Sequence, residues 1–355
     1  MLLMAAGPPS LRLVGAICAP IYFRLPARVA PPVNPMKTRF AIVLAVCGVA
    51  LAPGRETAQP ASKLFLVDAQ TPRGLRELFK PTADQLPLLS AHRGGAARGF
   101  PENCIATFEA TMRHGWSMLE IDLRTTRDGT VVLMHDPTLD RTTNGAGPVK
   151  DHTLAELRQL RLKDRQGNLT DHRIPTLDDA MKWARGKTIL VLDKKEVPVK
   201  QVVRIISEHR AEAYAMVMAY SIKEITECHA LNPDIMMEVM LGGPERFAEF
   251  DGSGVPWSNI IAFVGHTQAP DVDLCRRIRA KGASCMAGTS RNIDRQFLGG
   301  RVTAIEPLRG EYHALLERGV DVIETDIPRE LAPMLFGDQS SVGASKVRFL
   351  RIGQP

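Results

Sequence analysis

Residues suited to acid–base and metal chemistry are concentrated between Ala91 and Gly147. Two histidines, an arginine and two alternating carboxylates fall within 44 positions of the chain: His92, Arg93, Glu120, Asp122 and His135. Histidine exchanges a proton near neutral pH, and carboxylate oxygens are the ligands that hard divalent cations prefer. The stretch therefore predicts a site that combines proton transfer with cation binding.

The elements that must position these residues form a regular alternation of strand and helix. Near-continuous apolar runs, typical of parallel strands covered by helices, occur eight times. The expected strands are Leu88–His92, Met118–Thr126, Thr188–Lys195, Tyr214–Ser221, Ile235–Leu241, Ile260–His266, Ser284–Thr289 and Val322–Asp326. Eight strands that each lead into a helix predict an α/β fold, a closed (β/α)₈ barrel of the TIM type. A doubly wound open sheet is the alternative, but no glycine-rich phosphate loop follows the first strand.

Amphipathic runs between these strands predict the covering helices. The expected helices are Ile105–His114, Leu177–Arg185, Val199–His209, Ile222–Leu231, Glu245–Phe250, Val272–Lys281, Tyr312–Arg318 and Arg329–Leu335, with a lead-in helix at Arg73–Phe79. Gly115, Gly186, Gly282 and Gly319 each follow a helix, where a left-handed residue commonly ends it. A hairpin-like run, Thr130–His135, and an irregular segment up to Pro175 interrupt the pattern after the second strand.

The polar residues fall at the carboxyl ends of the expected strands, where active sites of such barrels lie. His92 and Arg93 end the first strand. Side chains alternate along a strand, so Glu120 and Asp122 share the face opposite the leucine and isoleucine side chains and point toward the barrel axis. On the third strand, Asp193 and Lys195 share one face in the same way.

Buried carboxylates are costly unless a cation neutralises them. Glu120, Asp122 and Asp193 therefore predict one bound divalent cation, and their all-oxygen chemistry favours Ca²⁺ or Mg²⁺. Lys195 is a cation suited to an anionic substrate. Each group taken singly is more often a solvated ion pair or a structural histidine. Their convergence on one rim of one barrel favours a site.

The net charge argues against a nucleic-acid partner. Five of the six net positive charges fall in residues 1–52, which contain no acidic residue, so the remaining chain carries about +1. Nucleic-acid binding normally requires a broad basic face. We expect a small-molecule substrate instead, and no integral membrane association of the mature form; the oligomeric state is not specified.

The N-terminal residues are typical of a targeting sequence. A short basic region beginning at Met36 precedes an apolar run, Phe40–Ala52, that ends in small residues, as in a secretory signal peptide. This predicts an exported protein, periplasmic or secreted, with Met36 as the favoured true start. A lipoprotein anchored through Cys47 is the less favoured alternative, because Val46 stands where a small residue is expected.

Four regions follow along the chain. We expect a targeting region in 1–52, a linker with a lead-in helix in 53–85, the catalytic barrel in 86–340 and a C-terminal tail in 341–355. Past the targeting region the cysteines fit no zinc pattern and are interpreted as isolated buried thiols, with one disulfide as the alternative. They are Cys104, Cys228, Cys275 and Cys285.

A set of short motifs, in this order, resembles the glycerophosphodiester phosphodiesterase family. The matching motifs are His92-Arg93-Gly94, Pro101-Glu102-Asn103, Glu120-Ile121-Asp122, Asp128-Gly129, His135-Asp136, Leu139-Asp140-Arg141-Thr142-Thr143, Gly145-Ala146-Gly147, Ile174-Pro175-Thr176-Leu177 and Thr325-Asp326-Ile327-Pro328. The resemblance runs from about Leu88 to Leu335. It implies a metal-dependent hydrolase that releases an alcohol and glycerol 3-phosphate, on a TIM-type barrel with an insertion after the second strand.

The resemblance also implies residue roles. His92 and His135 match the catalytic pair, and Arg93 and Lys195 match groups that bind the substrate phosphate. Glu120, Asp122 and Asp193 match the metal ligands, although the family usually has Glu at the third position. Asn103 resembles the N-cap of the first helix. Glu324, near the last strand end, is a further candidate to help the shorter Asp193 reach the metal.

Three questions stay open at this point. Either histidine can be the acid, and either water or a substrate hydroxyl can attack the phosphorus first. A phospholipase on the same barrel is an alternative function, but no long exposed apolar loop favours it. A degenerate, non-catalytic binding protein is the other alternative, supported by the Glu-to-Asp difference at position 193.

Overall fold

The computed structural model describes residues 63–83, 87–337 and 345–354. The chain divides into two units, Met1–Glu56 and Thr57–Pro355, and every described residue belongs to the second. The expectations about the targeting region, including Met36 and Cys47, lie outside the described residues.

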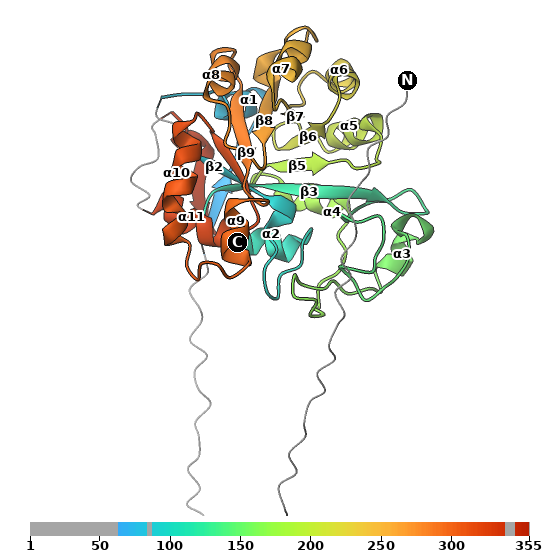
Figure 1. The fold of residues 1–355 in the computed structure, drawn as a ribbon. Helices are drawn as coiled ribbons and strands as arrows, with labels where there is room; N and C mark the ends of the chain where they lie inside the picture. Colours follow the sequence, from blue (N-terminus) through green and yellow to red (C-terminus); the bar gives the residue numbers. More distant parts are fainter. Residues whose placement is uncertain (1–62, 84–86, 338–344, 355) are drawn as a thin grey trace, which may run out of the picture. The chain divides into compact units, whose positions relative to one another are not determined.

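Eight parallel strands form a closed ring (Figure 1), because β2 pairs with β10 on one side and with β3 on the other. The strands are β2 Leu88–Ala91, β3 Ser117–Thr125, β5 Leu190–Asp193, β6 Ala215–Ala219, β7 Met237–Met240, β8 Ile260–Gly265, β9 Ser284–Gly288 and β10 Val322–Thr325. Each overlaps one of the eight predicted strands. The predicted (β/α)₈ barrel is confirmed.

Helices follow the strands and cover the barrel (Figure 1). The α-helices of the described residues are α1 Pro72–Leu78, α2 Ile105–Met112, α3 Leu154–Leu157, α4 Leu177–Ala184, α5 Val199–Glu208, α6 Ile222–Leu231, α7 Pro244–Asp251, α8 Val272–Ala280, α9 Ile293–Leu298, α10 Arg309–Glu317 and α11 Pro328–Phe336. All eight predicted covering helices and the lead-in helix are present. The short helices α3 and α9 were not predicted.

Local sequence explains where several of these elements begin and end. Thr176 and Ser221 each start a helix with a capping box, in which the cap hydroxyl accepts an N–H and an acid three residues on bonds back. Three of the four helix-ending glycines have a positive φ, as predicted. Gly115 does not: a Cβ there would lie 2.6 Å from Ala332 and Phe336, so this glycine permits close packing against α11.

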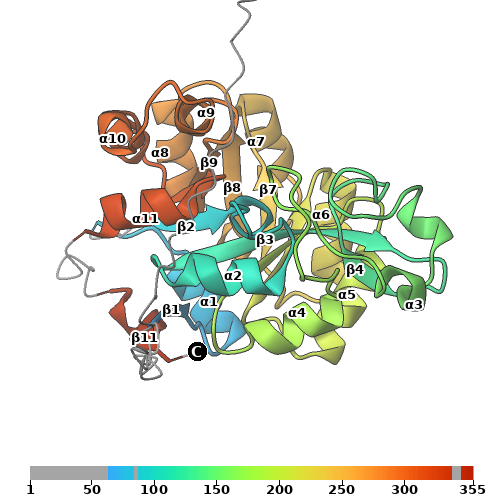
Figure 2. The same cartoon turned by 90° about the horizontal axis from the view of Figure 1, so that it is seen from below.

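The segment after β3 forms the predicted insertion. Strand β4, Val131–Leu133, pairs antiparallel with β3, and α3 follows farther on. Figure 2 shows this segment on the side of the barrel away from α10. It has a small apolar core of its own, which includes Val132, Leu139 and Leu157. This core supports the loop that carries His135 at the barrel mouth.

A two-stranded sheet joins the two ends of the described chain. Strand β1, Leu64–Val67, pairs antiparallel with β11, Leu350–Gly353. The Val67 N–H donates to the carbonyl of Lys187, just before β5, so the sheet lies at the amino end of the barrel, away from the predicted site. Neither strand was predicted, since these ranges were interpreted as a linker with one helix and as a tail.

The four cysteines of the described residues are free and buried, as predicted: Cys104, Cys228, Cys275 and Cys285. Across the described ranges, no helix combines the length and the apolar character needed to cross a bilayer.

Candidate active site

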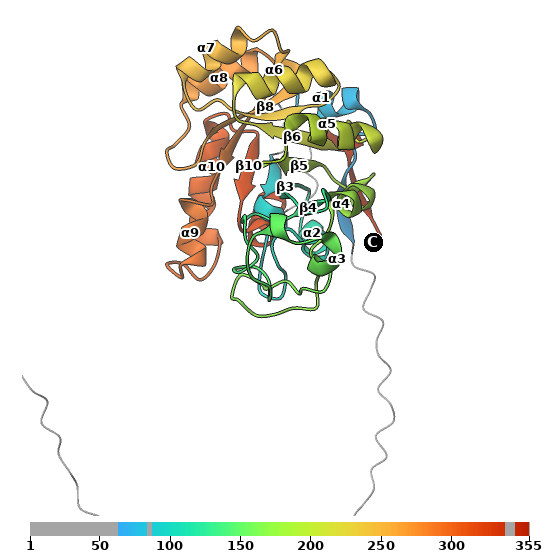
Figure 3. The same ribbon diagram turned by 90° about the vertical axis from the view of Figure 1, so that its right-hand side faces the viewer.

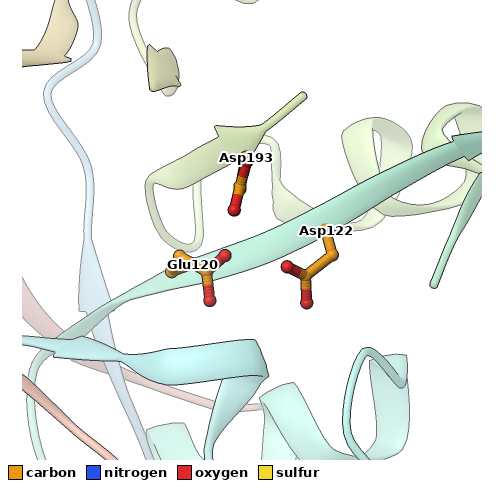
Figure 4. Close-up of side chains that lie close together, drawn as sticks. All are labelled: Glu120, Asp122 and Asp193. Carbon is orange, nitrogen blue, oxygen red and sulfur yellow. The ribbon is translucent and has the colours of Figure 1, made fainter. Parts of the chain in front are cut away.

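Three carboxylates meet at the carboxyl end of the barrel (Figure 4). Glu120 and Asp122 come from β3 and Asp193 ends β5; each offers an oxygen within 4.8 Å of the others. Strand register explains the meeting, because Asp122 pairs directly with Asp193. All three side chains are at least 95% buried, so they face the barrel interior as the alternation predicted.

The charges of this cluster are only partly balanced by the protein. Burial, followed by the charges of Asp122 and its acidic neighbours, raises the pKa of Glu120 well above its usual value. Lys195 is the nearest cation: its Nζ lies 2.7 Å from Asp122 Oδ1 and also contacts Asp193. Three buried carboxylates beside one lysine fit a hard divalent cation. The shorter Asp193 side chain still reaches the cluster, and Glu324 lies outside it.

Backbone strain is concentrated at this cluster. Among the described residues, five non-glycine residues have a positive φ, and three of them are site residues: Arg93, Asn103 and Lys195. Each such conformation costs on the order of 1 kcal/mol or more. For Arg93 the strained turn directs its backbone N–H to Glu120 Oε2 at 2.7 Å. The folded protein therefore accepts a loss of stability at these residues, and the strained backbone holds the site groups in position.

Asn103 holds Asp122 in place and does not cap the helix. Its Nδ2 donates to Asp122 Oδ2 at 2.7 Å, and its Oδ1 accepts the Asp122 N–H at 2.9 Å. The N-cap of α2 is Cys104, with no side-chain cap bond. The prediction of an Asn103 cap was wrong, because the left-handed backbone at this residue turns its amide into the barrel.

Each of the two candidate histidines has its own aspartate. His92 Nδ1 lies 2.7 Å from Asp326 Oδ1 on the segment after β10, and His135 Nδ1 lies 2.7 Å from Asp136 Oδ1. A carboxylate on Nδ1 places the proton there and leaves Nε2 free for chemistry. Burial alone would lower the pKa of His92, but the hydrogen bond to Asp326 and the negative charges nearby raise it overall.

An ion-pair network joins the second histidine to the phosphate-binding candidate. Arg141 pairs with Asp136 at 2.6 Å and with Glu102 at 2.7 Å, and Glu102 pairs with Arg93 at 3.2 Å. The hydrogen bonds from Arg141, acting against burial, lower the pKa of Asp136 far below its usual range. The insertion is thereby tied to the loop after β2, which fixes His135 relative to Arg93.

Most of the predicted site residues and a second set of polar groups line one cavity of about 420 Å³; the buried Asp122 lies behind this lining. We call Glu120, Asp122, Asp193, His92, His135, Arg93 and Lys195 the carboxylate half. On the β7–β9 side the lining groups include Glu238, His266, Arg291 and Arg295, which we call the open half. Both oxygens of Glu238 and Nδ1 of His266 are buried without a hydrogen-bond partner.

The structure brings together every residue that the sequence proposed for the site, and it adds others. Asp136 and Asp326 belong to motifs that carry the family resemblance. The sequence therefore indicated that each follows a strand, but it did not predict their hydrogen bonds to the two histidines. Asn103 was assigned a different role. Glu238, His266, Arg291 and Arg295 are groups that the structure adds to the site.

Comparisons with known proteins give one consistent result. The model of the glycerophosphoryl diester phosphodiesterase family matches residues 92–330. A glycerophosphodiester phosphodiesterase of Caldanaerobacter subterraneus subsp. tengcongensis is 32% identical over 161 residues, 43% of this chain and 66% of that protein. The matched parts span less than two thirds of the first curated relatives, at 66%, 64% and 57% of their lengths.

Solved structures agree with this result. The crystal structure of a glycerophosphoryl diester phosphodiesterase from Parabacteroides distasonis has a TM-score of 0.76 and 36% identity, and covers 81% of this chain and 99% of that one. An Oleispira antarctica phosphodiesterase in complex with the product sn-glycerol-3-phosphate has a TM-score of 0.53 and 23% identity, covering 72% and 97%. The latter shares the fold.

Proposed function

Because the chain belongs to the glycerophosphoryl diester phosphodiesterase family, we propose that it hydrolyses glycerophosphodiesters to an alcohol and glycerol 3-phosphate with one divalent cation. One observation carries the proposal. Two histidines, each with an aspartate on Nδ1, face the same cavity as Glu120 and Asp193, two of the three clustered carboxylates. Proton donor, proton acceptor and a place for a cation are the parts that phosphodiester hydrolysis needs.

Glu120, Asp122 and Asp193 are the residues that would hold the cation. Their all-oxygen donor set suits Ca²⁺ or Mg²⁺. Burial, and then the neighbouring carboxylates, raise the pKa of Glu120, and a bound cation would offset both effects. Bound there, the cation would supply charge neutralisation at the phosphoryl oxygens.

The remaining steps are the work of side chains. Arg93 and Lys195 bind the phosphate oxygens and offset the charge that grows on them as the nucleophile attacks phosphorus. One histidine takes the proton from the attacking oxygen, which is that of water or of a substrate hydroxyl. As the bond from phosphorus to the leaving oxygen breaks, the other histidine gives that oxygen a proton. Asp326 and Asp136 hold the two rings in position for these transfers.

The test is a product assay with and without metal. The purified protein is incubated with glycerophosphocholine or glycerophosphoinositol, in Ca²⁺, in Mg²⁺ or in chelator, and glycerol 3-phosphate is measured. We expect metal-dependent release that is lost in His92→Ala and His135→Ala. Full activity in both variants, or no hydrolysis of any diester with any divalent ion, would contradict the proposal.

Export is a separate proposal. It rests on the basic and apolar pattern of residues 36–52, which lies outside the described residues. Fractionation of expressing cells, with a variant in which Lys37 and Arg39 are replaced by Glu, tests it. We expect the unchanged protein outside the cytoplasm and the variant retained within; equal distribution of both would overturn the proposal.

A further inference from the structure

Two arginines of the open half have no ion-pair partner among the described residues. Arg291 follows β9, and Arg295 lies in α9, about one helical turn farther on. Both line the cavity that also holds His92, Arg93 and Lys195. Arg93, which lines the same cavity, is paired with Glu102. The two unpaired guanidinium groups therefore add positive charge to a cavity built for an anionic substrate.

The segment that carries these arginines is held rigidly by an acid between them. Asp294 is completely buried and turned away from the cavity. Its Oδ1 accepts the Tyr312 hydroxyl at 2.6 Å, and its Oδ2 accepts the Asp326 N–H at 2.7 Å and the Thr325 hydroxyl at 3.0 Å. Figure 3 shows α9 and α10 running beside β10.

Two consequences follow from this anchoring. The only acid within the segment is occupied elsewhere, so it does not neutralise Arg291 or Arg295. The same acid binds the backbone of Asp326, which orients His92, so the arginines are held in a constant relation to the reacting groups. Binding groups on a rigid support lose little freedom when a ligand arrives.

The neighbouring groups His266 and Glu238 offer polar atoms without hydrogen-bond partners, and the buried Glu324 lies 3.9 Å from His266. Burial, then Arg291 and His92, lower the pKa of His266 to about 4, so its ring is neutral at pH 7 and its Nδ1 is unpartnered. Burial, then Glu324 and Asp193, raise the pKa of Glu238 well above its usual value. The two exposed guanidinium groups are the permanent positive charges of this half.

We propose that Arg291 and Arg295 form a second anion subsite, which binds a phosphate group carried by the alcohol half of the diester. The proposal rests on the proposed function, because the reactive phosphate is assigned to Arg93, Lys195 and the cation. Guanidinium groups pair with phosphate oxygens through two parallel hydrogen bonds, and they stay charged at every working pH. The enzyme would thus favour diesters with two phosphates over those with one.

Matched substrate pairs test the proposal. Glycerophosphoinositol 4-phosphate and glycerophosphoinositol differ by one phosphomonoester, and bis(glycerophospho)glycerol and glycerophosphoglycerol differ by one phosphodiester unit. We expect kcat/KM to be about tenfold higher for the member with the extra phosphate in at least one pair. The pair that responds identifies the source of the second phosphate.

Variants then assign the preference to the two arginines. In Arg291→Gln/Arg295→Gln we expect the preference to fall to about twofold or less, while kcat/KM for the substrate with one phosphate changes by less than about threefold. The control, Arg204→Gln/Arg276→Gln, removes two charges from outer helices and should keep the full preference. Because this control loses the same number of positive charges, it separates the effect of the subsite from the general attraction of an anionic substrate to a positively charged protein.

Two outcomes would overturn the subsite. One is that the enzyme without substitutions shows the same kcat/KM for both members of each substrate pair. The other is a double variant that loses activity equally on both members, which would assign the arginines to the reactive phosphate. If the enzyme hydrolyses none of the four diesters, the proposed function itself is wrong. This outcome differs from failure of the subsite, in which diesters are hydrolysed without a preference for the second phosphate.

Discussion

The two halves of the cavity differ in how their polar groups are satisfied. In the carboxylate half each histidine has an aspartate on Nδ1, Asp122 is held by Asn103, and Lys195 contacts two carboxylates. In the part of the chain that the structure describes, Arg93 Nε of the carboxylate half has no hydrogen-bond partner. In the open half, neither oxygen of Glu238 has a partner there, and neither Arg291 nor Arg295 pairs with an acid. A buried polar group without a partner is costly.

This difference indicates a division of work. Groups that already hold one another in place are preorganised for a fixed reaction, which is where electrostatic catalysis gains most. Groups left without partners gain hydrogen bonds when a ligand arrives, so they are suited to recognising the variable part of a substrate. Four measurements test the contrast, from the largest expected effect to the smallest.

Removing a histidine of the carboxylate half should have the largest effect. We expect His135→Ala to lower kcat by roughly 10² to 10⁴, because general acid–base catalysis contributes about that much. Steady-state assays on glycerophosphocholine measure the change. His313→Ala, an exposed histidine of α10, is the matched control. A loss smaller than about tenfold would remove His135 from the reaction.

Metal binding should stabilise the carboxylate half and depend on Asp193. At 100 times its dissociation constant, a cation that binds only the folded protein adds about 2.7 kcal/mol to the free energy of unfolding. Calorimetry and chemical denaturation with and without Ca²⁺ or Mg²⁺ measure this. Asp193→Asn should abolish most of the gain, whereas Asp171→Asn, on an exposed loop, should keep it. Metal-independent stability of the unchanged protein would favour a degenerate site.

The aspartate behind His92 should control its proton. Asp326→Asn removes a hydrogen bond and a charge that raise the pKa of His92, so that pKa should fall. If His92 must be neutral to act as base, the acidic limb of the kcat/KM–pH profile moves to lower pH. If it must be protonated to act as acid, the basic limb moves to lower pH.

The same profile therefore assigns the roles of the two histidines. We expect kcat/KM at the optimum to fall by about tenfold to a hundredfold, since the ring loses its orientation. A profile with neither limb displaced would mean that Asp326 does not set the proton on His92. Asp140→Asn, in the insertion, serves as the control for a carboxylate that bonds no histidine.

The unsatisfied carboxyl group of the open half should cost stability in a pH-dependent way. Burial raises the folded-state pKa of Glu238 above its usual 4.5. The unfolded chain thus loses its proton first, and stability falls as pH rises from about 4.5 to the folded-state pKa. Glu238→Gln cannot titrate, so its advantage over the unchanged protein should appear in that window and stay constant above it.

The expected gain in chelator at pH 8 is about 1 to 3 kcal/mol of unfolding free energy, the usual range for a buried polar group without a partner. Denaturant unfolding from pH 4 to 8 measures it. Glu317→Gln, an exposed residue of α10, should give a change within about 0.5 kcal/mol at every pH. If Glu238→Gln lowers the free energy of unfolding instead, the carboxyl group of Glu238 has a hydrogen-bond partner within the folded protein.

Much of the barrel was predictable because its signals are local. Strands buried on both faces appear as apolar runs, and β3 is buried over seven of its nine residues, as its composition requires. The inward direction of Glu120 and Asp122 follows from the two-residue period alone. The strands and α-helices that were missed, β1, β11, α3 and α9, are four to six residues long, and the pairing of β1 with β11 joins the two ends of the described chain.

The amino-acid sequence by itself determined which residue types stand at the strand ends and which face of β3 they occupy. Only the tertiary structure decided how they are paired. His92 and Asp326 are 234 positions apart, and Asn103 reaches Asp122 through a left-handed turn. The physical reason is that strand alternation depends on neighbouring residues, whereas a hydrogen bond between distant strands exists only once the barrel has closed.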